Sequence, residues 1–378
     1  MSPKDNPQPA RAEAGLPKQA LSYDGRIGEL YGIFLLNLLL TVVTLGIYRP
    51  WAVTRMRRYV WSRTSFQGDR FEYTGTGLEM FLGYLAAIAI LFGLYLAFAV
   101  LVIVASLISR PLEYAVISLS PTFAILAFAG IFSAQRYRLS RTLWHGIRGG
   151  MRGSALAFGS RAFLYLVAVI LTLSLGVPWM TVRLFERRIN ASSFGNLAFN
   201  FVGRARRLYR PYLVEWVTFF SLTIALLAIV YHAFGAPIFH TSHAGRMSPE
   251  VEKAVTTLLY GLVAGFLIIS LITAVPHSFY AAALAREVAD NTSLGPLRFS
   301  CRVSGWTLLS VSIGNLLILL FTLGLGYPIV IQRNARLLAE SLLVSGEFDP
   351  ATLRQNAEPG SEFGEGLSQA FGGTGGLL

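Results

Sequence analysis

Two asparagines lie inside apolar stretches of the sequence, where an amide side chain has few partners. Asn37 and Asn315 occupy equivalent positions in two related blocks of sequence, and Tyr165 holds that position in a third block. An amide in an apolar environment is costly unless it is hydrogen-bonded, and polar groups within membranes often mark pathways or contacts between helices. We therefore expect Asn37 and Asn315 either to join neighbouring helices or to contact a solute.

Three arginines follow the proline of each block at one common spacing. They are Arg55, Arg183 and Arg333, after Pro50, Pro178 and Pro328. An arginine at the end of an apolar segment can place its charge at the membrane surface while its stem covers apolar atoms. A convergent cluster of such arginines would instead bind anionic lipid headgroups or an anionic solute. Both interpretations follow from the sequence.

No arrangement of residues indicates catalysis or metal binding. The glycine-rich segment 146–153 lacks the Gly-Lys-Ser/Thr ending of a phosphate-binding P-loop. The chain has one cysteine, Cys301, which excludes an intramolecular disulfide and a multi-cysteine metal site. His240 and His243 have metal-like spacing but no third ligand nearby. We expect no enzymatic activity, no cofactor and no metal.

The composition identifies a membrane protein. Hydrophobic residues make up 54% of the chain and charged residues 14%, whereas a soluble domain carries about 25% charged residues. A spanning helix needs about 20 mostly apolar residues, so about seven charge-free runs are long enough or nearly so. These runs cover 30–48, 80–109, 114–135, 162–182, 216–239, 254–285 and 303–332. The predicted fold is an all-α polytopic membrane protein.

Basic segments separate the apolar runs and account for the net charge of +12. They cover 55–70, 136–161, 183–210, 286–302 and 333–354. In so apolar a chain, clustered arginines are typical of cytoplasmic loops, so we expect the lipid bilayer and its anionic headgroups as partners and no nucleic acid. Each segment is predicted to begin as a helix, and the alternating aromatic residues of 64–75 and 192–203 indicate short extended segments or turns.

Composition and the repeated blocks together divide the chain into three parts, since the blocks lie only in the middle one. Residues 1–22 are predicted to be a disordered cytosolic tail, 23–345 a repeat-built transmembrane domain, and 346–378 a glycine-rich disordered tail.

Successive basic segments are joined alternately by two apolar runs and by one. This alternation brings the number of membrane crossings into conflict with the expected cytoplasmic location of the basic segments. If every run spans, the third basic segment falls on the side of the membrane opposite the second, against the positive-inside rule. If all basic segments are cytoplasmic, the single runs 30–48, 162–182 and 303–332 must enter and return on one side. Re-entrant backbone is tolerated only where it is buried in protein or lines a wet cavity. We expect the same-side arrangement, with both tails cytoplasmic.

The residues of 45–52, Leu-Gly-Ile-Tyr-Arg-Pro-Trp-Ala, and of 71–77, Phe-Glu-Tyr-Thr-Gly-Thr-Gly, resemble the bacterial YjgN family. This family consists of inner-membrane proteins built around a domain of unknown function. The resemblance extends from about residue 22 to residue 348 through the repeated blocks. It implies a bacterial inner-membrane location and carries over no catalytic residues.

Two functions fit these observations. The first is a transporter or permeation pathway for a small solute or lipid, because internal repeats and interrupted membrane segments are typical of transporters. The alternative is a non-transporting scaffold that binds anionic lipid or a partner protein through its basic cytoplasmic face. A wet cavity lined by Asn37, Asn315 and the three arginines would favour transport.

Overall fold

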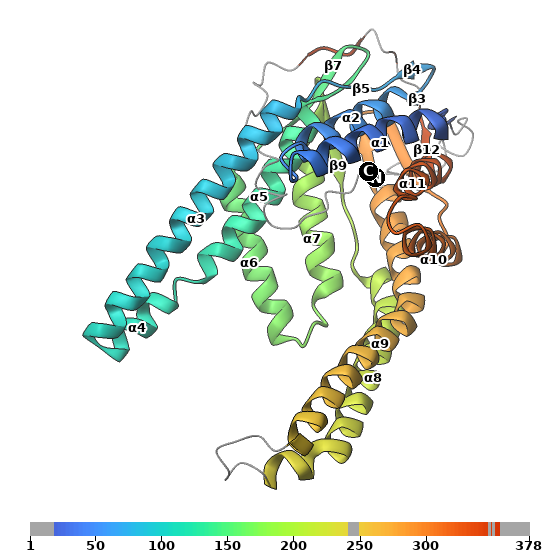
Figure 1. Cartoon of the computed structure of the whole chain (residues 1–378). Coiled ribbons are helices and arrows are strands. Elements are labelled where there is room, and N and C mark those ends of the chain that lie inside the picture. The colour runs from blue at the N-terminus through green and yellow to red at the C-terminus, as the bar shows by residue number, and fades with distance from the viewer. Residues whose placement is uncertain (1–18, 241–248, 347–348, 350–351, 356–378) are drawn as a thin grey trace, which may run out of the picture. The chain divides into compact units, whose positions relative to one another are not determined.

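The structure is a computed structural model that describes residues 19–240, 249–346, 349 and 352–355. The chain forms two compact units. The first unit comprises residues 1–203, 288–302 and 314–378, and the second comprises 204–287 and 303–313. Helices dominate both units, and short strands connect each group of successive helices to the next (Figure 1).

Four helical stretches within the described residues are long and apolar enough to cross a membrane. The first unit holds α3 (Gly77–Ile108) and the stretch formed by α4 (Arg110–Ile117) and α5 (Pro121–Ser140). The second unit holds α8 (Arg206–His240) and α9 (Pro249–Asp290). Their apolar side chains are largely exposed, as expected for helices that face lipid. The expectation of a helical membrane protein is confirmed at this level.

Three shorter apolar helices each turn back into a more polar helix. They are α1 (Ile27–Val43) before α2 (Arg49–Ser62), α6 (Ala155–Leu171) before α7 (Val177–Asn190), and α10 (Gly305–Phe321) before α11 (Tyr327–Ser341). In each pair the second helix carries a proline in its first turn, where the missing N–H has no helical partner to lose. We call these pairs the short hairpins. They correspond to the three single apolar runs of the sequence.

All three short hairpins use the same turn. Two successive residues adopt positive φ, as at Leu45 (50°) and Gly46 (92°). A threonine hydroxyl just before them donates to the carbonyl one turn earlier and accepts the first free N–H of the returning helix. The accepting bonds are Tyr48 N to Thr44 Oγ1 at 3.0 Å, Gly176 N to Thr172 Oγ1 at 3.0 Å, and Gly326 N to Thr322 Oγ1 at 2.7 Å. The threonine therefore satisfies backbone groups that would otherwise be unpaired at the break.

The tips of the short hairpins expose apolar side chains. Leu45 is 94% exposed and Leu323 is 90% exposed, and Leu173 holds the same place in the third turn. Polar turn residues would be expected at these positions if the tips faced water. The turn chemistry therefore indicates contact with an apolar environment.

Short strands from all along the first unit assemble into sheets. A nine-stranded sheet has the order β1-β12-β11-β10-β9-β8-β7-β6-β5, and a second sheet has the order β2-β3-β4. The strands are β1 Gln19–Ala20, β2 Ser22–Tyr23, β3 Thr64–Phe66, β4 Asp69–Arg70, β5 Glu72–Tyr73, β6 Thr142–Trp144, β7 Ile147–Met151, β8 Ser192–Phe194, β9 Leu197–Phe201, β10 Thr292–Leu294, β11 Leu297–Cys301 and β12 Leu342–Ser345. An all-helical description of the fold omits this sheet.

Each helical excursion in the described residues leaves one strand and returns to the strand beside it. The excursions α1–α2, α6–α7 and α10–α11 are bracketed by the antiparallel pairs β2–β3, β7–β8 and β11–β12. The excursions α3–α5 and α8–α9 are bracketed by β5–β6 and β9–β10. The segments that adjoin these strands therefore meet in the sheets, whatever the length of the helices between them.

An apolar cluster on the sheet collects one side chain from a corresponding strand position in each of five strands. These residues are Phe66, Trp144, Phe194, Leu294 and Val344. Leu297 and Leu353 complete the cluster. The strands at 64–66 and 192–194 lie where the sequence indicates extended segments, whereas the strands at 142–144 and 342–345 were not predicted.

The predicted tail boundaries enclose some residues with defined structure. Within 1–22, residues 19–20 form β1 and residue 22 begins β2, and β1 pairs with β12. Within 346–378, Leu353 packs in the sheet cluster, and Arg354 N donates to Asn196 Oδ1 at 3.1 Å. Residues 1–18 and 356–378 lie outside the described residues.

The second unit is held together at polar points on its helices. The Glu287 carboxylate accepts from Arg204 N at 2.8 Å and lies 3.8 Å from Arg207 Nη1. Farther along the two helices, His277 Nδ1 lies 2.9 Å from Glu215 Oε1. These contacts tie α9 to the beginning of α8.

Tyr23 supplies a stability prediction for the first unit. Its hydroxyl is buried without a hydrogen-bond partner among the described groups, and burial together with Tyr59 raises the Tyr23 pKa from its ordinary value of 10.0 to about 12. The folded state therefore favours the neutral phenol, and this contribution to stability is lost as pH rises from about 10 through about 12. We expect Tyr23→Phe to lose less stability than the wild type across this range, measured as the unfolding midpoint in detergent at pH 7, 10 and 11. Identical pH slopes would contradict the assignment.

Candidate functional site

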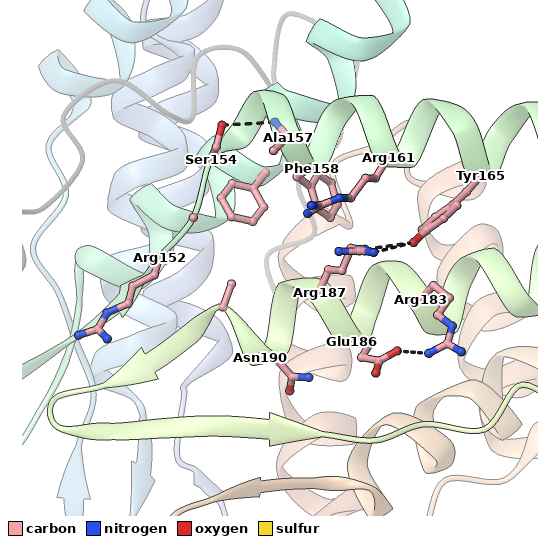
Figure 2. Close-up of a pocket in the computed structure, with 13 residues that line it drawn as sticks. Arg152, Ser154, Ala157, Phe158, Arg161, Tyr165, Arg183, Glu186, Arg187 and Asn190 are labelled. Carbon is pink, nitrogen blue, oxygen red and sulfur yellow. Dashed lines mark hydrogen bonds and ion pairs between the residues drawn. The ribbon is translucent and has the colours of Figure 1, made fainter.

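The first unit contains a cavity of about 520 Å3 between α6, α7 and the end of β7 (Figure 2). Its wall combines aromatic, hydroxyl and strongly basic groups. The lining residues are Phe132, Arg152, Gly153, Ser154, Ala157, Phe158, Arg161, Tyr165, Arg183, Glu186, Arg187, Asn190 and Ala191.

The cavity is positively charged, because four arginines and a single carboxylate line it. Arg183 Nη1 pairs with Glu186 Oε2 at 2.6 Å, so the carboxylate is already engaged. Arg187 donates from Nε and Nη2 to the Tyr165 hydroxyl at 3.1 and 2.9 Å. These bonds fix the Arg187 guanidinium between the two helices of the hairpin.

The helices of the hairpin position these groups through simple spacing. Arg183 and Arg187 are four residues apart on α7, which places them on one helical face. Figure 2 shows Arg161 and Tyr165 on the side of α6 that faces α7, and Arg187 reaching from α7 toward Tyr165. Ser154 caps α6 by accepting a hydrogen bond from Ala157 N at 3.3 Å. The positive end of the α6 dipole therefore lies at the cavity, where it favours an anion.

Positive charge extends beyond the cavity wall. Arg188, the next residue on α7, donates from Nε to Gln135 Oε1. Burial and the neighbouring charge of Arg138 lower the Arg188 pKa to about 10, so the group still carries its charge at neutral pH. The arrangement as a whole suits the binding of an anion. Among the described residues there is no group of three or more metal-binding side chains, and His243 lies outside those residues.

The two predicted asparagines join the helices of their own short hairpins. Asn37 is 3% exposed, and its Nδ2 donates to the carbonyl of Ala52 on α2 at 3.3 Å. Asn315 Nδ2 donates to Asn334 Oδ1 on α11 at 2.9 Å. Tyr165 holds the equivalent place on α6, where it binds Arg187. The same position therefore connects the two helices in all three hairpins.

The three predicted arginines lie against different parts of the first unit. Arg55 is exposed and its guanidinium lies 5.6 Å from the centre of the Tyr48 ring. The Arg333 guanidinium packs so close to Gly314 that a Cβ there would lie 2.6 Å from Nη1. Among the five predicted site residues, Arg183 alone lines the cavity.

The sequence interpretation missed the other basic residues of the cavity, Arg152, Arg161 and Arg187, and their partner Tyr165. A signal was present in the order of the segments. Arg152 and Arg161 come from the second basic segment, and Arg183 and Arg187 come from the third. The single apolar run 162–182 joins these two segments. If this run turns back to the side of the membrane where it began, the two basic segments meet.

The Asn315–Asn334 pair supplies a second prediction. Asn315→Leu leaves the amide of Asn334 without this partner, and a lost buried hydrogen bond costs about 1–3 kcal/mol. We expect either single leucine substitution to lower the unfolding midpoint in detergent. The double substitution Asn315→Leu/Asn334→Leu should recover part of the loss, with a coupling of about 0.6–1.7 kcal/mol. Additive effects would show that the two amides do not interact.

Similarity to known proteins extends over nearly the whole chain. The model of a family described as "Bacterial protein of unknown function (DUF898)" matches residues 18–370. The chain belongs to this family. It is 26% identical over 388 residues to the inner membrane protein YjgN of Salmonella typhimurium, an alignment that covers 90% of this chain and 91% of the relative.

Shorter alignments point to the same relatives. The inner membrane protein YjgN of Escherichia coli O157:H7 is 30% identical over 136 residues, covering 36% of this chain and 32% of the relative. The protein of the same name from Escherichia coli K12 is 29% identical over 146 residues, covering 39% and 34%. No solved structure matches the chain. The sequence resemblance is confirmed: these relatives are named inner membrane proteins, which agrees with the apolar helices described above.

Proposed function

We propose that this integral membrane protein binds anionic lipid headgroups at the base of its helical hairpins and does not act as an enzyme. The observation that carries this proposal is the cavity between α6 and α7, whose lining residues include four arginines and a single carboxylate. The helices that form its walls also expose apolar side chains such as Leu164 and Leu171. An anionic lipid offers a charged group and hydrocarbon at the same place.

The proposal includes a topology in which the four long stretches span the bilayer and the short hairpins enter and return. Support comes from the paired strands that bracket every excursion. The first helix of each short hairpin has 17 residues, or roughly 25 Å of length, against a hydrocarbon core of about 30 Å. The basic segments and the sheet would then lie on one side, which the positive-inside rule makes cytoplasmic.

The same proposal treats the chain as a set of degenerate repeats. Its support is the common turn of the short hairpins, with its threonine, its two residues of positive φ and its following proline. The equivalent interhelical positions of Asn37, Tyr165 and Asn315 add to this support.

A transport pathway for a small solute is the second candidate function. It requires a wet passage lined by Asn37, Asn315 and the repeat arginines. Asn37 is instead buried in its own hairpin, and the cavity contains Arg183 but neither asparagine. Headgroup binding is therefore the better-supported function.

Topology is tested by labelling single cysteines in intact cells and in inverted membrane vesicles. Cys301 is first replaced by serine, and cysteine is then introduced at His145, Asn190 or Ser118. We expect His145→Cys and Asn190→Cys to react from the cytoplasmic side, and Ser118→Cys, in the turn between α4 and α5, to react from the opposite side. Labels at 145 and 190 on opposite faces would refute the re-entrant arrangement.

Lipid binding is tested by quantifying the lipids that co-purify with the protein after mild detergent extraction. We expect anionic phospholipids to be enriched over their proportion in the source membrane. A co-purified composition equal to that of the membrane would contradict headgroup binding. A parallel flux assay on proteoliposomes loaded with anionic solutes tests transport, and we expect no flux above that of protein-free vesicles.

A further inference from the structure

We propose that the cavity between α6 and α7 is a site for a phospholipid headgroup that carries two negative charges on phosphate oxygens. A phosphate monoester and a pair of linked phosphodiesters share this chemistry. The inference rests on the proposed function and deepens it, because it places the anionic lipid in one cavity and gives its headgroup two negative charges.

The charge balance of the wall favours a doubly charged ligand. Arg161, Arg183 and Arg187 together with Glu186 leave a net excess of positive charge, and a headgroup with a single negative charge would neutralise only part of it. The fourth arginine of the wall, Arg152, turns its guanidinium away from these groups (Figure 2). Removing charges from water is costly unless they are paired. A dianion leaves less of the positive charge of this cavity unpaired than a monoanion does.

The arginines differ in how far they are already committed. Arg183 is paired with Glu186, and Arg187 is held by Tyr165. In the described part of the chain Arg161 has no hydrogen bond or ion pair, and it lies on the side of α6 that faces α7 (Figure 2). Arg187 also retains N–H donors beyond its two bonds to Tyr165. Arg161 and Arg187 together therefore offer donors from both helices to one phosphate group.

The apolar surroundings distinguish a lipid from a soluble phosphate. Phe132, Phe158 and Ala157 form part of the cavity wall. Leu156 and Leu164 extend the apolar surface along the outside of α6, and both are exposed. A volume of about 520 Å3 accommodates the glycerol backbone next to the phosphate. The acyl chains would continue along the exposed face of α6 toward the hairpin tip.

The test is a lipid titration of the full chain in detergent, followed by native mass spectrometry. The probes are phosphatidic acid, cardiolipin, phosphatidylglycerol, phosphatidylcholine and inorganic phosphate. The cavity variant is Arg161→Gln/Arg187→Gln, and the charge-matched control is Arg206→Gln/Arg302→Gln, which removes two exposed arginines outside the cavity. Tyr165→Phe keeps every charge but releases Arg187, and unfolding midpoints establish that each variant is folded.

We expect phosphatidic acid and cardiolipin to bind the wild type more tightly than phosphatidylglycerol. The cavity variant should lose about tenfold or more in affinity for both, because two charge-assisted hydrogen-bonding groups are removed together. The control should change about twofold or less, and Tyr165→Phe should fall between the two variants.

Three results would overturn the inference in distinguishable ways. If the cavity variant and the control lose equal affinity for phosphatidic acid and cardiolipin, the cavity is not the binding site, although the protein still binds anionic headgroups in general. If the wild type binds inorganic phosphate but no lipid, and the cavity variant loses the phosphate, the ligand of the cavity is a soluble phosphate and not a lipid headgroup. Equal binding of anionic lipids and phosphatidylcholine to the wild type would refute the proposed function itself.

Discussion

Replacement of Trp144 by alanine is expected to cause a large loss of stability in the first unit. The Trp144 side chain is 5% exposed, and its ring lies 5.5 Å from Phe66, 6.0 Å from Phe194 and 6.2 Å from Phe71, measured between ring centres. Truncation of a buried tryptophan costs about 3–5 kcal/mol. In a chain of this size the unfolding midpoint should fall by roughly 10 °C.

The measurement is thermal unfolding of the purified protein in detergent. Trp144→Phe retains an aromatic ring and should produce a smaller loss, which gives a readable variant if the alanine variant does not fold. Trp306→Ala is the control, because Trp306 is largely exposed. Within the described residues its ring contacts one other aromatic ring, that of Phe279. An equal loss at 144 and 306 would show that the sheet cluster does not stabilise the first unit.

Gly159 is the second position with a large expected effect. A Cβ at this residue would lie 2.3 Å from the Ile125 carbonyl oxygen and 3.1 Å from Ala129 N, both on the backbone of α5. Backbone atoms cannot rotate away, so α5 and α6 must separate to admit even a methyl group. Overpacking of this kind costs about 1–3 kcal/mol. We expect Gly159→Ala to lower the unfolding midpoint and Gly159→Leu to lower it further.

Gly93 supplies the matched control for this prediction. It lies in the interior of α3, and a Cβ there would meet nothing within 4 Å. Alanine is the better helix former by about 0.5–1 kcal/mol, so Gly93→Ala should leave stability unchanged or raise it slightly. If both substitutions have the same effect, helix propensity rather than close helix packing explains the result.

Close packing at Gly159 also bears on the cavity. Phe158 lines the cavity and its ring lies 5.1 Å from that of Phe132 on α5. Separation of α5 from α6 would therefore move one wall of the site. We expect the Gly159 variants to weaken phosphatidic acid binding in parallel with their loss of stability. The single substitution Arg161→Gln, which breaks no hydrogen bond found in the described residues, should weaken binding with little loss of stability.

The membrane helices and the turns between them follow directly from the amino-acid sequence. Apolar runs such as 80–109 identify spanning segments because a backbone in hydrocarbon must satisfy its own hydrogen bonds within a helix. The blocks around Pro50, Pro178 and Pro328 also mark the ends of apolar helices correctly, because threonine, positive-φ residues and proline act locally. The family could likewise be identified from residues 45–52 and 71–77.

The sheet and the cavity depend on residues that are distant in sequence. Strands of three to five residues, such as β6 and β7, are too short to show a clear alternation. Pairing between strands that are far apart in the sequence, such as Phe201 of β9 with Thr292 of β10, leaves no pattern in the neighbouring residues. For this reason Trp144 was not predicted to be a core residue, although Thr142 precedes it as Thr64 precedes Phe66.

The sequence alone determined that this is a helical membrane protein of a bacterial inner-membrane family, because hydrophobicity and local turn chemistry act within a few residues of one another. Only the tertiary structure decided which side chains meet. Arg55, Arg183 and Arg333 share one register along the chain, yet among these three arginines only Arg183 lines the cavity, together with Arg161 and Arg187. Asn37, Tyr165 and Asn315 share another register, and each joins the two helices of its own hairpin. The physical reason is that a binding site requires groups from separate helices to converge, and the strand pairs that return each helix to its neighbour control that convergence.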